Sequence, residues 1–87
     1  MDMTKKLVNY ILENVNVEEI RFTYSQMCMK KTDLARQNWE LYNDLENYVD
    51  NFIEDNELDD EWFETEVGLI DDLFEELLKE IWLWKIV

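Results

Sequence analysis

Carboxylates are the only residues in this sequence that are numerous enough to suggest a chemistry. The 87 residues include 22 Asp and Glu against eight Lys and Arg, a net charge of −14, with no histidine and one cysteine. Carboxylates can serve acid–base catalysis, metal binding or electrostatic attraction to a basic partner. The absence of histidine removes the commonest general base near neutral pH and the commonest metal ligand. The positions of the carboxylates must decide among the three.

Catalysis and metal binding lack the patterns that they require. Nothing in the sequence marks two of the carboxylates as a desolvated pair that could act as acid and base. No glycine-rich phosphate loop, Cys/His cluster or Ser-His-Asp set can be assembled. Five acidic residues do fall at the spacing of an EF-hand loop, but Asp60 stands where the sharp turn needs glycine; they are Asp55, Glu57, Asp59, Glu61 and Glu66. We predict a protein that is not an enzyme and has neither a cofactor nor a metal site.

The negative charge is confined to one part of the sequence. Residues 1–36 hold six Lys and Arg against five Asp and Glu, a net of +1, whereas residues 37–87 hold two against seventeen, a net of −15. A surface charged only for solubility usually mixes both signs. We interpret the one-sided charge as a surface for a basic partner, with a merely solvated helix face as the alternative. The carboxylates predicted to form this surface are Glu57, Asp59, Asp60, Glu61, Glu64, Asp71, Asp72, Glu75, Glu76 and Glu80.

Two apolar patterns predict the helices that position these carboxylates. In residues 59–84, apolar side chains alternate at intervals of four and three, which predicts one helix with a single apolar face; they are Phe63, Val67, Ile70, Phe74, Leu77, Ile81 and Trp84. A similar pattern after an N-cap at Thr32 or Asp33 predicts a second long helix, with Leu34, Asn38, Leu41, Leu45, Tyr48 and Phe52 on its face. Residues 54–60 are polar enough to connect the two, with Asp59 or Asp60 as the cap. A short link predicts a long antiparallel hairpin.

Two shorter helices are expected before this hairpin. The first begins at the N-cap Thr4 and ends near Asn14. The second is indicated by Asn16 and Glu19, which have nearly the spacing of a capping box. Residues 20–29 also alternate as a strand would, but we favour a helix because no partner strand is evident. With no proline and one glycine in the sequence, the expected fold is all-α: a single domain of residues 1–87 forming a small helical bundle.

The last seven residues, IWLWKIV, have too many apolar side chains for one helix face. This segment either turns back onto the core or forms an oligomer contact, so Trp82 and Trp84 are candidates for such a contact and a homodimer is one expected assembly. The sequence has no run of about 18 apolar residues, its N-terminus lacks the features of a signal peptide, and Cys28 is alone. We expect a cytoplasmic protein that does not bind membranes.

In overall character the sequence resembles the acidic DNA-mimic inhibitors that phages use against CRISPR or restriction nucleases. The resemblance covers residues 39–84 and rests on their charge pattern. Between Glu61 and Glu80 there is one carboxylate per roughly 3.7 Å of helix axis, close to the roughly 3.4 Å between phosphates along a DNA strand. The resemblance implies an inhibitor that blocks the basic groove of a nuclease complex or another nucleic-acid-binding protein and does not itself bind nucleic acid. A helical homo-oligomeric adaptor is the alternative.

Overall fold

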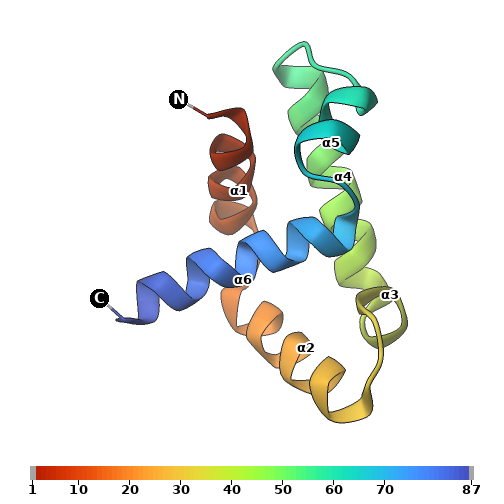
Figure 1. The fold of residues 1–87 in the computed structure, drawn as a ribbon, viewed down its shortest axis with the longest axis vertical. Coiled ribbons are helices and arrows are strands. Elements are labelled where there is room, and N and C mark those ends of the chain that lie inside the picture. Colours follow the sequence, from red (N-terminus) through yellow and green to blue (C-terminus); the bar gives the residue numbers. More distant parts are fainter. Residues whose placement is uncertain (1, 87) are drawn as a thin grey trace.

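The computed structural model describes the backbone of residues 2–86 and the side chains of residues 2–82. Over this range the chain forms six helices and no strand (Figure 1): α1 (Met3–Asn14), α2 (Val17–Lys30), α3 (Leu34–Gln37), α4 (Trp39–Asp55), α5 (Asp60–Glu66) and α6 (Ile70–Ile86). The predicted all-α class is confirmed. The stretch that could have been helix or strand is a helix.

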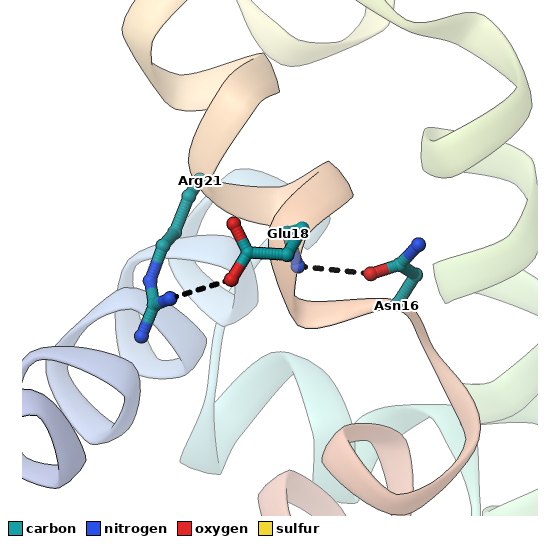
Figure 2. Close-up of polar contacts among 3 residues, drawn as sticks. All are labelled: Asn16, Glu18 and Arg21. Atoms are coloured by element: carbon teal, nitrogen blue, oxygen red, sulfur yellow. Dashed lines mark hydrogen bonds and ion pairs between the residues drawn. The ribbon is translucent and has the colours of Figure 1, made fainter.

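The first two helices begin and end close to the predicted positions. The cap of α1 is Asp2 rather than Thr4: the Thr4 backbone N–H donates to Asp2 Oδ1 at 3.1 Å. Asn16 caps α2 as predicted, and Figure 2 shows its side-chain oxygen accepting from the Glu18 backbone N–H at 3.0 Å. The left-handed conformation of Lys31, with φ 54°, ends α2. Local hydrogen bonds therefore set these boundaries.

The long helix predicted from Leu34 is wrong, because the backbone breaks at Asn38. This residue has φ −148° and ψ 83°, which separates the single-turn α3 from α4. Asn38 Oδ1 accepts from the Leu41 N–H at 3.1 Å and caps α4. Asn38 Nδ2 donates to Glu19 Oε1 and to Thr23 Oγ1, each at 3.1 Å. The break is stabilised because one amide satisfies both the start of α4 and polar groups of α2.

The single helix predicted over residues 59–84 is also wrong. Asp59 caps α5 as predicted, by accepting from the Trp62 N–H at 2.9 Å. The backbone then leaves the helix at Gly68, where φ is +112° and the N–H donates to the Phe63 carbonyl at 2.9 Å. That φ favours glycine. The helix restarts as α6, and Asp72 Oδ2 accepts from the Leu69 N–H at 2.8 Å, one half of a capping box.

The predicted long antiparallel hairpin is not confirmed. Figure 1 shows α5 beside the end of α4, while α6 crosses the direction of α4 rather than running back along it. In this position α6 contacts α1, α2 and α4. The break at Gly68 thus converts a simple hairpin into a bundle arranged around α6.

The core is one continuous cluster to which all six helices contribute. Six of its buried side chains come from α6: Ile70, Leu73, Phe74, Leu77, Leu78 and Ile81. They pack with Leu7 and Ile11 of α1, Ile20 of α2 and Leu41 and Leu45 of α4, all fully buried. Each such side chain stabilises the fold by about 1.5–3 kcal/mol relative to exposure. Much of the predicted apolar face is buried despite the missed breaks, although Val67 is only half-buried and Leu73 and Leu78, which are buried, were not on that face. None of the helices in the described range combines the length and hydrophobicity needed to cross a bilayer.

Candidate functional site

A groove of about 230 Å³ lies between α4, α5 and the start of α6, and we call it the acidic groove. Four exposed carboxylates line it: Glu46 and Asp50 from α4, and Asp60 and Glu64 from α5. Its remaining lining includes Tyr42, the break residues Gly68 and Leu69, and the apolar side chains Val49, Ile53, Phe63 and Ile70. The helix break and the α4–α5 connection together create this concave surface.

The four carboxylates form two rows that face one groove. Within each row the residues are four apart, so Glu46 lies one turn from Asp50 and Asp60 one turn from Glu64. Like charges at this spacing destabilise a helix by about 0.2–0.5 kcal/mol per pair. Among the described side chains, the ion pairs involve only Glu18, Asp33 and Glu76, so no cation compensates either row.

The floor of the acidic groove is apolar. Val49, Ile53, Phe63 and Ile70 are all buried in the core below the carboxylates. Long basic side chains combine an aliphatic stem with a charged head, and they place the stem on apolar surface while the head stays among polar groups. The groove therefore matches the chemistry of Lys or Arg side chains better than that of an apolar or anionic ligand.

The aromatic side chains of Tyr42, which lines the groove, and Trp39 lie together at one end of it. The rings of Trp39 and Tyr42 stack with centroids 5.5 Å apart and planes 9° apart, and Trp39 is 59% exposed. Burial raises the pKa of the Tyr42 hydroxyl, and the nearby carboxylates of Glu46 and Asp71 raise it further. The part of the shift that comes from these carboxylates reflects a negative local potential. An exposed indole in such a field is suited to contact a cation.

The ten carboxylates predicted as a partner surface have different local surroundings. Only Asp60 and Glu64 line the acidic groove. Asp59 and Asp72 cap α5 and α6, so one oxygen of each accepts a local hydrogen bond. The Glu76 carboxylate pairs with Lys79 Nζ at 3.3 Å.

The other five predicted residues do not line the acidic groove. Glu57 ends α4 in the left-handed conformation with φ 57°. Glu61 and Asp71 are exposed, and Glu80 is half-buried. Glu75 lies near Tyr24 of α2, whose pKa is raised first by a hydrogen bond with Cys28 and, less strongly, by that carboxylate.

Three polar residues of the groove were not among the predicted set: Tyr42, Glu46 and Asp50. They are spaced four apart, which places them on one face of α4. This spacing in the sequence could have indicated that the three side chains share one face of a helix. It could not show that the face meets α5, because that depends on the turn between residues 55 and 60.

A second cavity, of about 420 Å³, lies between α2 and α6, and we call it the apolar groove. Tyr24, Cys28, Met29, Leu78, Ile81 and Trp82 line it, together with Arg21 and Ser25. Trp82, one of the two predicted oligomer contacts, is 48% exposed here. The side chain of Trp84, the other predicted contact, lies outside the described residues.

The described side chains contain no group of three or more His, Cys, Asp or Glu that could hold a metal ion. In the stretch with EF-hand spacing, Asp59 instead caps α5. Comparisons with protein-family models, curated proteins and solved structures gave no match. Function must therefore be inferred from the residues themselves.

Proposed function

We propose that this chain is a non-enzymatic inhibitor that mimics nucleic acid and blocks the basic DNA- or RNA-binding groove of a nuclease or another nucleic-acid-binding protein, in the manner of phage anti-CRISPR or anti-restriction proteins. The observation that carries the proposal is the pair of uncompensated carboxylate rows on α4 and α5. Each row costs folding free energy. A surface that keeps this cost without a neutralising cation suits a partner that supplies the cations.

Each row presents charge in a fixed geometry. Residues four apart on a helix are separated by about 6 Å along the axis. The α4 row is anchored by Leu45 and Val49, and the α5 row by Phe63, all of which are buried. Because the backbone is already ordered, binding would cost less conformational entropy than the ordering of a flexible acidic tail.

A basic partner would recognise this surface in two ways. The net charge of −14 would attract it over long range and speed association at low salt. At contact, Lys or Arg heads would pair with the carboxylates while their stems cover the apolar floor. The carboxylates would then stand where the partner otherwise binds phosphates, so the chain and nucleic acid could not bind together.

The test is an isosteric neutralisation of the acidic groove. The variant carries Glu46→Gln, Asp50→Asn, Asp60→Asn and Glu64→Gln. A matched control loses the same four charges elsewhere through Glu13→Gln, Asp44→Asn, Glu54→Gln and Glu66→Gln, all at exposed positions. Partners are captured from a lysate at low and high salt and purified, and their affinities for the three proteins are measured with and without their own DNA or RNA.

We expect the groove variant to lose affinity at least tenfold more than the control, and the nucleic acid to compete with the wild-type chain. Binding should weaken steeply with salt. A partner that binds this chain and nucleic acid at the same time would refute mimicry. Equal losses in the two variants would show that net charge, not the groove, is recognised.

The homo-oligomeric adaptor is favoured by one separate observation, the exposed apolar side chains Phe22, Met29 and Trp82 on α2 and α6. An adaptor would bind its partners through this apolar surface with little dependence on salt. The groove variant would then bind as the wild type does, which separates the two functions.

A further inference from the structure

Part of the surface formed by α2 and residues 78–82 of α6 consists of large apolar side chains that are exposed. Phe22 is 65% exposed, Met29 74% and Trp82 48%, and the apolar groove of about 420 Å³ lies between these helices. A cluster of large exposed apolar side chains on a small protein usually marks a contact surface. This surface is separate from the acidic groove on α4 and α5, so its occupant must be inferred from its own chemistry.

The charge of this surface differs from that of the remaining molecule. The apolar groove is lined by one charged residue, Arg21, and by no carboxylate, whereas the acidic groove is lined by four carboxylates. Two copies of a chain with charge −14 repel each other, and the repulsion is weaker at the apolar groove, beside which lie Glu18, paired with Arg21, and Glu75, near Tyr24, than at the acidic groove with its four lining carboxylates. A basic protein would be drawn to the acidic groove instead. The α2–α6 surface is therefore the part of the molecule best suited to a second copy.

The two ends of α2 carry opposite charges. Glu18 and Glu19 occupy its first turn, while Lys30 and Lys31 lie at its end. Glu18 is held at the N-terminal end by Arg21, whose Nη1 donates to Glu18 Oε1 at 2.8 Å (Figure 2). Lys31 takes part in none of the ion pairs of the described side chains. Two such helices placed antiparallel bring the acidic end of each beside the basic end of the other, and their dipoles then oppose.

The surface needed for such a contact is modest. A stable interface buries about 800 Å² on each partner, which is about one seventh of the 5920 Å² accessible surface of this chain. In a twofold-symmetric interface every contact occurs twice, so each favourable pair counts double. The midpoint of the sequence between Glu18 and Lys31 falls at Tyr24 and Ser25, which both line the apolar groove.

We propose that a second copy of this chain docks on the α2–α6 surface, forming a twofold-symmetric dimer in which the two α2 helices run antiparallel and Met29 and Trp82 lie in the interface. The dimer leaves both acidic grooves free and presents them on one particle. The proposal does not depend on the partner of the acidic groove, since it concerns a different surface.

The first test measures the oligomeric state of the full chain by sedimentation equilibrium at micromolar concentrations. Met29→Glu places a charge in the interface twice, and we expect it to raise the dimer dissociation constant by on the order of 100-fold. Leu69→Glu is the matched control, because Leu69 is an apolar side chain with 69% exposure that lines the acidic groove instead. The control should dimerise as the wild type does. A monomeric wild type, a dimeric Met29→Glu variant, or an equal effect of both substitutions would overturn the proposal.

The second test asks whether the contact is antiparallel. Glu18→Lys and Lys31→Glu should each weaken self-association on the order of tenfold, because each places like charges together at both ends of the interface. An equimolar mixture of the two variants restores both opposite-charge pairs and should recover the wild-type affinity. Recovery in the mixture supports the proposal, whereas a mixture as weak as the single variants would overturn the antiparallel arrangement. Far-UV circular dichroism confirms that each variant is folded.

Discussion

Replacing Gly68 by alanine tests the helix break that creates the acidic groove. Gly68 adopts φ +112°, and a Cβ atom added there would collide with the carboxylate of Asp72. That carboxylate is already occupied, because it accepts the Leu69 N–H at the start of α6. The substitution must therefore strain the backbone at residue 68 and displace the cap of α6.

The expected loss of stability follows from these two effects. A non-glycine residue in such a backbone conformation costs about 1–3 kcal/mol, and loss of a helix cap costs about 0.5–2 kcal/mol. Alanine also stabilises the folded state by about 0.4–1 kcal/mol, because it lowers the conformational entropy of the unfolded chain. We therefore expect Gly68→Ala to lower the free energy of unfolding by about 2–3 kcal/mol. That is a large part of the 5–15 kcal/mol typical of a whole domain.

The assay is urea denaturation followed by far-UV circular dichroism, with Asp72→Ala and the double variant as controls. Asp72→Ala removes the cap alone and should cost about 1 kcal/mol. In the double variant the collision is absent, so its loss should be smaller than the sum of the two single losses. Additive losses would show that Gly68 and Asp72 do not interact.

The sign of the change in the free energy of unfolding of Gly68→Ala distinguishes a broken helix from a continuous one. If residues 59–84 formed one continuous helix, alanine at position 68 would stabilise the protein by about 0.8–1.0 kcal/mol. A gain in stability would therefore refute the break between α5 and α6. It would also remove the physical basis for the acidic groove.

Three further predictions concern local features. Asn38→Ala removes the cap of α4 and a donor to the buried Thr23 hydroxyl. Urea denaturation should show that the free energy of unfolding falls by about 2 kcal/mol. A fall smaller than the error of the measurement would contradict the role of this amide. Glu57→Gly should raise the free energy of unfolding by about 0.5–1 kcal/mol, because Glu57 ends α4 at φ 57°, where glycine has no steric cost; a lower melting temperature would be inconsistent with that conformation. The pKa of Tyr42 in the folded protein lies above its ordinary value of 10.0, because the folded state holds the hydroxyl proton more tightly than the unfolded state. The contribution of this proton to the free energy of unfolding is therefore complete below about pH 10, and it is lost as the pH rises through the folded pKa. Ultraviolet titration should show the Tyr42 pKa falling in Glu46→Gln, and an unchanged pKa would mean that this carboxylate does not act on the ring.

Local signals in the sequence were sufficient to predict half of the helix starts and much of the buried faces. Asn16 and Asp59 cap their helices because a short side chain with an oxygen satisfies backbone N–H groups two or three residues ahead. Leu7, Ile11 and Leu77 are buried because their spacing puts them on one face of a helix. Such effects act within a few residues, so they can be recognised without knowing the fold.

The helix breaks could not be predicted from the same signals. The apolar spacing continues through Asn38 and Gly68 as though each helix were uninterrupted. Asn38 breaks its helix because its amide also bonds to Glu19 and Thr23, which reach it only after α2 has packed nearby. Gly68 permits a conformation that most residues avoid, but the sequence does not show whether a glycine will use that freedom.

The sequence by itself determined the helical class, the caps at Asn16, Asp33 and Asp59, much of the buried faces and the restriction of net negative charge to residues 37–87. The tertiary structure alone decided which carboxylates meet. Glu46 and Asp50 come to face Asp60 and Glu64 because the chain turns after α4 and breaks at Gly68, and Asp59 and Asp72 are drawn into capping by those same turns. The charge of a side chain is a property of its residue type, whereas the groove that it lines depends on backbone conformations and on contacts between distant helices.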